Sequence, residues 1–499
     1  MRFCPAAIGF LLLLVASVAA RAAPPNVLLL MGDDHAPYVT GTYGNRQVRT
    51  PHLDRLAAAG MRFDRAFCNS PVCTASRQSL ITGRYPRTIG VTQLATPLPE
   101  SETTLAELLK AAGYDTAAIG KMHFNSQLQH GFDHRIDLPE YRQWLTQQPS
   151  LPLPTGVETL GVWRPFRDPA SVWLNAACRP FASVDARMSG AYFAAQADQW
   201  LRQSRAAPFF LVVSFYEPHS PFHFPVEYAH RHAASEFNPP PVDPRDLAQI
   251  PQIFRDLTDD QKRGIIAAHH TSVEYLDQNI GRVLHSLEQT GHADDTLVIY
   301  LGDHGYLLGQ HGRFEKHTSY EEAIRAALLM RYPPWIPNGG GADAMVKLVD
   351  LLPTVLDACG VAPPATTQGR SLRGVLTGAA STHRDAVFVE YAPNEEACLR
   401  TSRWKIVYRA GQHVRADGYK PSDSPVGQEL ALYDLESDPH ELTNLADDPA
   451  AAPTRDELLA QLLKQLRATA RPSVPLPSSD EPMLRQLEAL VQPHDLPGA

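Results

Sequence analysis

The stretch "NVLLLMGDD", residues 26–34, is a run of large apolar residues that ends in a glycine and two aspartates. A short apolar run that stops at turn-forming and acidic residues is typical of a strand buried on both faces of a parallel sheet. Three other segments have the same form: "YDTAAIGKMHF" (114–124), "PFFLVVSFYEPHSP" (208–221) and "TLVIYLGDHG" (296–305). The sequence therefore predicts several buried strands, each followed by polar residues.

Helical patterns lie between these runs, in "TPHLDRLAAAGMRF" (50–63), "TTLAELLKAAG" (103–113) and "SVEYLDQNIGRVLHSLEQTG" (272–291). Strands that alternate with helices predict an α/β fold, with a large, mostly parallel sheet sandwiched by helices. Ligands of such folds bind beyond the carboxyl ends of the strands. All four polar clusters follow strands, so we expect them to meet at one edge of the sheet.

The pattern changes after about residue 375. The segments "AVFVEY" (386–391), "WKIVYRA" (404–410) and "ELALYDL" (429–435) read as short strands without intervening helices, and "RDELLAQLLKQLRATA" (455–470) is an amphipathic helix. We therefore predict an α/β domain at 23–375 and a C-terminal α+β subdomain with its tail at 376–499, built on a smaller antiparallel sheet plus a helix. The proline-rich tail from Arg471 is either a wrapping arm or a loosely held segment.

Residues 1–22 have the form of a secretory signal peptide, with Arg2 before the apolar core "IGFLLLLVASVAA". This core is short for a membrane span, so we expect no stable membrane span. The chain has no N-x-[ST] glycosylation sequon, which favours a bacterial, exported protein that is periplasmic or extracellular. A formal net charge of -9 over 499 residues argues against a general nucleic-acid partner.

Six cysteines are too few for a disulfide scaffold in a chain of 499 residues. Cys4 leaves with the signal peptide, and an odd number then remains: Cys68, Cys73, Cys178, Cys359 and Cys398. Up to two disulfide bridges could form, and one sulfur would still be left over.

Three aspartates at strand ends, Asp33, Asp34 and Asp303, are hard oxygen ligands that suit Ca²⁺ or Mg²⁺ better than Zn²⁺. The alternative for Asp33 and Asp34 is a helix cap or a turn. A second acidic cluster after another strand favours a metal site, in which His304 is a further ligand or polarises the substrate.

Five cations lie near the same predicted edge: Arg77, Lys121, His123, His219 and Lys316. Each alone is more often a surface residue or a satisfied core residue. Together they predict a positive pocket for a tetrahedral oxyanion, whose transition state spreads charge over several oxygens. We expect His219 and Lys316 on the leaving-group side, and Arg77, Lys121 and His123 on the nucleophile side.

Cys73 opens the segment "CTASRQSLITGRYP" (73–86). The spacing to Arg77 is too short for a thiolate phosphatase loop, and a thiol is a poor ligand for a hard cation. From its chemistry alone, Cys73 is as well explained as a buried structural residue.

The segment resembles the signature of the sulfatase family, in which C-x-[PA]-x-R is followed by T-G-R. This resemblance implies that a maturation enzyme oxidises Cys73 to formylglycine. One hydroxyl of the hydrated aldehyde then attacks sulfur, and the other later expels sulfate. Ala75 stands where proline is more common. The resemblance also implies one Ca²⁺ per chain, held by Asp33, Asp34, Asp303 and His304 with the modified Cys73.

The resemblance extends over nearly the whole chain. "AGYDTAAIGKMHF" resembles the stretch with the active-site Lys121 and His123, "FYEPHSP" the strand end with His219, and "GDHGYLLGQHGRFEKH" the stretch with Asp303, His304 and Lys316. Lys121, His219 and Lys316 are implied to bind the substrate. The implied fold is alkaline-phosphatase-like. The histidine at position 304 resembles the residue at this place in iduronate- and choline-sulfatases, whereas the segment "EKHTSYEEAIRAALLMRYP" (315–333) looks more like that of hexosamine-sulfate enzymes.

The leading interpretation is a calcium-dependent sulfuric ester hydrolase that acts on a sulfated small molecule or sugar. A phosphonate or phosphate ester hydrolase of the same fold is the first alternative, because that pocket holds another tetrahedral anion. A secreted glycan-binding protein without catalysis is the second. The segment "VETLGVWRPFRDPASVWLNAACRP" (157–180) is either the rim of the pocket or a loop packed on its own core.

Overall fold

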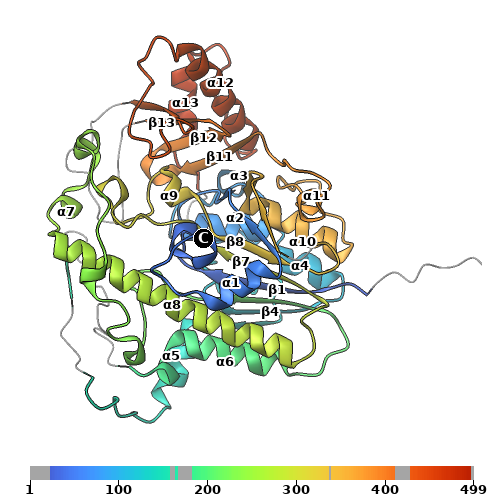
Figure 1. Cartoon of the computed structure of the whole chain (residues 1–499). Helices are drawn as coiled ribbons and strands as arrows, with labels where there is room; N and C mark the ends of the chain where they lie inside the picture. The colour runs from blue at the N-terminus through green and yellow to red at the C-terminus, as the bar shows by residue number, and fades with distance from the viewer. Residues whose placement is uncertain (1–22, 158–162, 167–182, 337–338, 411–427, 496–499) are drawn as a thin grey trace, which may run out of the picture.

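The computed structural model describes residues 23–157, 163–166, 183–336, 339–410 and 428–495 (Figure 1). Its centre is an eight-stranded sheet with the order β5-β4-β6-β1-β7-β8-β2-β9. The strands are β1 Asn26–Gly32, β2 Met61–Phe63, β4 Asp115–Gly120, β5 His134–Ile136, β6 Phe209–Ser214, β7 Thr296–Gly302, β8 Leu328–Arg331 and β9 Gly340–Ala342. A second, two-stranded sheet joins β3 (Ala66–Phe67) to β10 (Val346–Lys347).

The four strands predicted from apolar runs are confirmed as β1, β4, β6 and β7, and they are parallel neighbours. β1 lies between β6 and β7, and Gly32 of β1 pairs with Gly302 of β7. This register brings the residues after β1 and β7 to the same edge of the sheet. The sheet is mixed because β8 runs antiparallel to both β7 and β2.

Helices cover both faces of the sheet (Figure 1). Alternate residues of β1 enter two different cores: Val27 and Leu29 pack with apolar residues of α2, α4 and α10, whereas Leu28 and Leu30 pack with those of α1, α6 and α8. This two-sided burial explains why β1 is apolar without alternation. The α-helices are α1 Pro51–Ala58, α2 Cys73–Thr82, α3 Pro86–Ile89, α4 Leu105–Ala111, α5 Leu138–Thr146, α6 Ser189–Leu201, α7 Gln252–Arg255, α8 Asp259–Gln289, α9 Glu321–Ile324, α10 Leu351–Cys359, α11 Arg373–Leu376, α12 Ala452–Thr469 and α13 Met483–Leu490.

The C-terminal part forms the predicted separate antiparallel sheet, with α12 packed on it. Its four strands are β11 Ala386–Tyr391, β12 Glu396–Thr401, β13 Trp404–Arg409 and β14 Glu429–Asp434. Three of these were predicted, and β12 was missed because "EACLRT" contains three charged or polar residues. The described tail wraps back onto the rest of the chain: the backbone N–H groups of Thr92 and Gln93 donate to Asp495 at 2.9 and 3.0 Å.

Polar contacts join the C-terminal sheet to the large α/β unit. Arg384, just before β11, donates from Nε to Asp350 at 2.8 Å, and the ammonium of Lys347 donates to the carbonyl of Phe388 in β11. The Asp350 and Lys347 side chains are fully buried. The two parts therefore share buried charged groups as well as apolar contacts.

The expectation of up to two disulfide bridges is not met among the cysteines that the structure describes. Cys68, Cys73, Cys359 and Cys398 are all free and buried, which places each thiol in a packed interior. Cys4 and Cys178 lie outside the described residues, as do the predicted signal peptide and most of the predicted rim segment 157–180. In the described part of the chain, no helix combines the length and the apolar character needed to span a membrane.

Candidate active site

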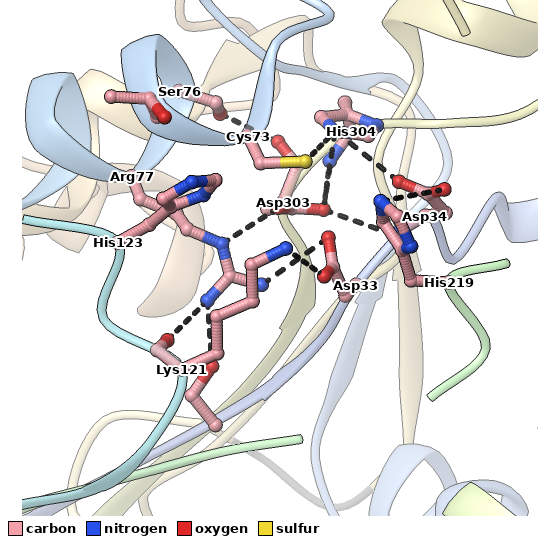
Figure 2. Close-up of polar contacts among 12 residues, drawn as sticks. Asp33, Asp34, Cys73, Ser76, Arg77, Lys121, His123, His219, Asp303 and His304 are labelled. Carbon is pink, nitrogen blue, oxygen red and sulfur yellow. Dashed lines mark hydrogen bonds and ion pairs between the residues drawn. The ribbon is translucent and has the colours of Figure 1, made fainter. Parts of the chain in front are cut away.

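The edge of the sheet brings two pairs of polar residues together. Asp33 and Asp34 follow β1, and Asp303 and His304 follow its parallel neighbour β7. The backbone N–H of Asp34 donates to Asp303 Oδ1 at 3.1 Å, so the two strand ends are linked directly. All four side chains are at most 1% exposed. The predicted meeting of the two acidic clusters is thus confirmed (Figure 2).

Cys73 is the first residue of α2, and its side chain points toward the strand ends (Figure 2). All ten residues of this helix are buried. The thiol lies 3.1 Å from Lys316 Nζ and 3.3 Å from His304 Nε2. A helix N-terminus carries unsatisfied N–H groups and partial positive charge, which favours an anionic group at this position.

Arg77, one turn further along α2, binds the strand ends and not the thiol. Its Nε donates to Asp303 Oδ2 at 2.7 Å, and its Nη1 donates to Ser214 Oγ at 2.7 Å and to the carbonyl of Lys121 at 2.5 Å. A third group, Nη2, lies 3.6 Å from Asp33 Oδ1. Arg77 therefore contacts the ends of four strands, β1, β4, β6 and β7, and fixes them relative to α2. Its expected place on the nucleophile side stays a prediction.

Two lysines bring ammonium groups to the aspartates. Lys121 donates to Asp33, and Lys316 donates to Asp34 Oδ1 at 2.5 Å. Lys121 follows Gly120, whose φ of +91° and close approach to the carbonyl of Ser214 leave no room for a Cβ. Lys316 was expected on the leaving-group side, yet its ammonium also contacts the sulfur of Cys73.

His219 and His123 stand at the wall of the site. His219 follows β6, and its Nε2 lies 3.9 Å from Asp34 Oδ2 while its Nδ1 bonds to the carbonyl of Ser220 at 2.6 Å. About a third of its side chain is exposed, at 34%. Asp34 is buried, so His219 is the member of this pair that a ligand can reach from the cavity.

The charges in the site shift several pKa values. Burial raises the pKa of the Cys73 thiol, but Lys121, Lys316 and His304 outweigh burial and bring it well below its ordinary value. Burial raises the pKa of Asp303 to about 6, although the nearby charges of His304 and Arg77 act to lower it. Burial would lower the pKa of His304, but Asp303 and Cys73 raise it to about 9. The site therefore favours an anion at position 73 and cations around it.

The residues fit a hard divalent cation. Ligand atoms of Asp33, Cys73, Asp303 and His304 lie within 4.8 Å of one another, and so do those of Asp33, Asp34, Cys73 and His219. Asp33 Oδ1 is fully buried and accepts no hydrogen bond from the described residues. Carboxylate oxygens are the ligands that Ca²⁺ and Mg²⁺ prefer, whereas the encoded thiol of Cys73 does not suit such an ion.

A cavity of about 850 Å³ opens onto these residues. Asp34, Cys73, Lys121, His123, His219 and Lys316 line its inner part, and residues of the segment 124–140 line its wall. This volume falls in the range of sites for small molecules and sugars.

All ten residues predicted for the site lie in this one cluster or in its cavity wall: Asp33, Asp34, Cys73, Arg77, Lys121, His123, His219, Asp303, His304 and Lys316. Sequence reasoning missed the partners that orient them. Ser214 binds Arg77, Ser76 Oγ donates to the carbonyl of Asp303 at 2.6 Å, and the Tyr216 ring lies 5.5 Å from Lys121 Nζ. The available signals were the places of Ser214 at the end of β6, of Tyr216 just after it and of Ser76 within the signature helix.

The comparisons with known families agree with this site. Residues 25–361 match the family model described as Sulfatase, and residues 309–469 match the model described as N-sulphoglucosamine sulphohydrolase, C-terminal. The first match covers more than half of the 499 residues. The chain belongs to the sulfatase family, a family of sulfuric ester hydrolases.

Individual relatives cover most of the chain. An N-acetylglucosamine-6-O-sulfatase of Bacteroides thetaiotaomicron is 28% identical over 88% of this chain and 86% of its own length. A choline-sulfatase of Rhizobium meliloti is 28% identical over 85% of this chain and 83% of its own length.

Solved structures show the same fold. A phosphonate monoester hydrolase from Silicibacter pomeroyi has a TM-score of 0.75 at 23% identity, over 91% of this chain and 97% of that one. A structure described as a complex with its substrate D-glucosamine-2-N,6-O-disulfate has a TM-score of 0.69 at 23% identity, over 89% of this chain and 98% of that one. Both confirm the predicted architecture.

Proposed function

We propose that this sulfatase releases inorganic sulfate from a sulfated carbohydrate, with a formylglycine made from Cys73 as nucleophile and one bound Ca²⁺. The observation that carries the proposal is the position of Cys73. Its side chain stands at the buried start of α2, 3.1 Å from Lys316 Nζ and beside a cluster of three carboxylates. Formylglycine replaces the soft sulfur with oxygen, the donor that suits a hard cation at this place.

The proposed calcium ligands are Asp33, Asp34, Asp303 and His304, together with the modified side chain at position 73. When bound, the ion supplies positive charge for a sulfate oxygen and for the nucleophile. Arg77 keeps Asp303 and Asp33 in place from the side away from the cavity. We propose that Lys121, His219 and Lys316 bind the oxygens of the sulfate ester, because all three line the inner cavity.

The hydrolysis has two steps. In the first, one hydroxyl of the hydrated aldehyde bonds to sulfur, the ester S–O bond breaks, and the sugar oxygen takes a proton. His219 is placed to donate this proton, since its pKa is raised: burial and Lys316 lower it, but Asp34 and Asp33 outweigh them. In the second step, the other hydroxyl loses its proton, the C–O bond to the sulfate group breaks so that sulfate leaves, and the restored aldehyde adds water to form the hydrate again.

Phosphonate or phosphate ester hydrolysis remains the second candidate. This candidate is favoured by the fold that the chain shares with two phosphonate monoester hydrolases, at TM-scores of 0.75 and 0.74. The experiment is a comparison of kcat/KM on 4-nitrophenyl sulfate, 4-nitrophenyl phosphate and a phenylphosphonate ester with protein whose Cys73 is modified. We expect the sulfate to be the best substrate, and a clear preference for either phosphorus ester would replace the sulfatase assignment.

Other parts of the sequence prediction complete the proposal. We propose that residues 1–22 direct export to the periplasm or the exterior of a bacterial cell, and that a formylglycine-generating enzyme acts on the chain. The boundary between the catalytic domain and the C-terminal subdomain is proposed at residue 375. Edman sequencing of the secreted protein would test the first point, and a mature N-terminus near Ala23 is the expected result.

A further inference from the structure

One charged residue of the cavity wall has no part in the chemistry above. Arg135 in β5 lines the same cavity as Cys73 and is half-buried. Its Nη1 donates to the carbonyl of Leu128, and its guanidinium carbon lies 5.1 Å from the centre of the Phe124 ring. Among the described residues, its Nε and Nη2 donate to no acceptor. These two groups form the edge of a guanidinium that grips carboxylates and sulfates in a bidentate manner.

Three other cations of this cavity have acidic partners, whereas Arg135 has none among the described residues. Lys121 pairs with Asp33, Lys316 pairs with Asp34, and His219 lies 3.9 Å from Asp34. No carboxylate oxygen in the described chain lies within ion-pair distance of Arg135. Burial lowers the pKa of Arg135, and Asp137 and Glu140 act against this effect only from a distance. A ligand anion would therefore stabilise a charge that the protein leaves without a direct counterion.

The carboxylates of the same wall are already engaged. Asp137 accepts from the backbone N–H of Leu138 and from Tyr216 Oη, both at 2.7 Å, and Glu140 accepts from the backbone N–H of Asp137 at 2.8 Å. Glu315 accepts from Arg313 at 2.6 Å. Helix capping and ion pairing thus occupy these acids, which reduces their repulsion of an anionic ligand.

The position of Arg135 separates it from the scissile ester. Arg135 pairs with Ala118 of β4, three residues before Lys121. At the rise of a β-strand, the Cα of Arg135 lies about 10 Å from that of Lys121, measured along the strand direction. Gln127 and Gln129, which are exposed and line the same cavity, add amide groups at the rim. The wall therefore meets a part of the substrate away from the sulfate that is cleaved.

We propose that Arg135 forms a second anion subsite, which binds a carboxylate or a further sulfate group carried by the sugar substrate at a distance from the scissile sulfate. The inference rests on the proposed function and specifies its substrate class: a sulfated carbohydrate with at least two anionic groups. Its guanidinium supplies the bidentate contact, and the Phe124 ring keeps the guanidinium plane in place.

Steady-state kinetics on four substrates test the subsite. 4-Nitrophenyl sulfate and N-acetylglucosamine 6-sulfate carry one anion, glucosamine N,6-disulfate carries a second sulfate, and a singly sulfated disaccharide with a uronic acid carries a carboxylate. We expect Arg135→Gln to raise KM about 10- to 100-fold on one or both doubly anionic substrates, with little change in kcat, because a charge-assisted hydrogen bond is lost. Arg135→Lys should restore part of the affinity. The doubly anionic substrate that is affected identifies the group as sulfate or carboxylate.

The controls separate this role from a structural one. Arg142→Gln removes an exposed arginine of α5 that does not line the cavity, and it should change none of the four KM values. Equal losses of Arg135→Gln on all four substrates would show that Arg135 only supports the loop through Leu128, and no loss on any would also overturn the proposal.

Direct binding distinguishes failure of the subsite from failure of the proposed function. Calorimetric titrations of glucosamine N,6-disulfate and of the uronic acid disaccharide into Cys73→Ala should give, for at least one of the two ligands, an affinity that falls about 10- to 100-fold in Cys73→Ala/Arg135→Gln. This difference requires no turnover. If the wild-type protein hydrolyses no sulfate ester but the affinities differ, the proposed function is wrong and the subsite stands. If the affinities of the two proteins are equal for both ligands, the subsite is wrong.

Discussion

The ammonium of Lys316 lies 3.1 Å from the sulfur of Cys73, and the same nitrogen donates to Asp34 at 2.5 Å. A buried lysine between a carboxylate and the side chain at position 73 favours negative charge on whatever atom replaces the sulfur. Lys316 follows His219 by 97 residues in the sequence, but both side chains lie beside Asp34 in the fold. The effect of Lys316 on reactivity therefore depends on whether position 73 carries the encoded thiol or the oxygen of formylglycine.

The first prediction concerns that state. Protein with formylglycine at position 73 should be active, and protein with the encoded Cys73 should be inactive, because a thiol is the wrong donor beside hard carboxylates. Specific activity should rise in proportion to the converted fraction. Mass spectrometry of the tryptic peptide 66–77 measures conversion, and Cys68 in the same peptide is an internal cysteine that should stay unmodified. Full activity in a batch with only unmodified Cys73 would require another nucleophile.

The second prediction concerns the cation. Chelation followed by dialysis should abolish activity, and Ca²⁺ should restore it. Asp303→Asn should remove Ca²⁺ binding in a calorimetric titration while the protein stays folded by circular dichroism, since Asp303 is a proposed ligand at a strand end. Unchanged activity in protein that elemental analysis shows to be free of metal would contradict the calcium site.

The third prediction separates His219 from Lys316. His219→Ala should lower kcat/KM on a sugar sulfate by about 10²- to 10⁴-fold and much less on 4-nitrophenyl sulfate, whose leaving group needs no proton. Lys316→Ala should impair both substrates, because Lys316 contacts position 73 itself. Equal losses of His219→Ala on both substrates would show that His219 binds or orients the sulfate without protonating the leaving oxygen.

The sheet and the members of the site were predictable because both leave a local mark on the sequence. A strand buried on both faces must be continuously apolar, and parallel strands must end at a common edge, so Asp33 and Asp303 could be brought together from the pattern alone. The family signature added Cys73. The direction of long side chains leaves no such mark. The contacts of Arg77 with the strand ends and of Lys316 with Cys73 could therefore not be predicted.

The cavity wall was not predictable for a related reason. Arg135 is placed by the pairing of β5 with β4. β5 has only three residues and no apolar run, so the sequence gives no sign of this strand. Likewise, the disulfide count could be bounded from the number of cysteines, but pairing depends on distances between thiols that only the fold determines.

The last prediction concerns the join between the two parts of the chain. Asp350 is fully buried and accepts hydrogen bonds from Arg384, from His383 and from the backbone of Lys347. Burial would raise the pKa of Asp350, but Arg384 and His383 hold it below its ordinary value of 3.8. The ionised carboxylate therefore stabilises the fold, and its removal leaves Arg384 buried beside a neutral group.

Asp350→Asn should lower the free energy of unfolding by about 3–5 kcal/mol near neutral pH, the cost of breaking a buried ion pair from one side. Because the folded pKa is depressed, the contribution of Asp350 is complete above its unfolded pKa and is lost as the pH falls below about 3.8. The difference between wild type and variant should thus shrink in acid. Urea denaturation at neutral pH and near pH 3 measures both effects.

The matched control is Asp343→Asn, which breaks an ion pair with Arg65 whose aspartate side chain is 77% exposed. Solvent screens such a pair, so its loss should cost about 1 kcal/mol or less. A cost for Asp350→Asn as small as that of the control would show that the contacts of Asp350 contribute little to holding the C-terminal sheet. If the difference in the free energy of unfolding between wild type and Asp350→Asn grew as the pH fell, the depressed pKa would be contradicted. A carboxylate with a depressed folded pKa stabilises the fold less as the pH falls below its unfolded pKa, so this difference has to shrink in acid.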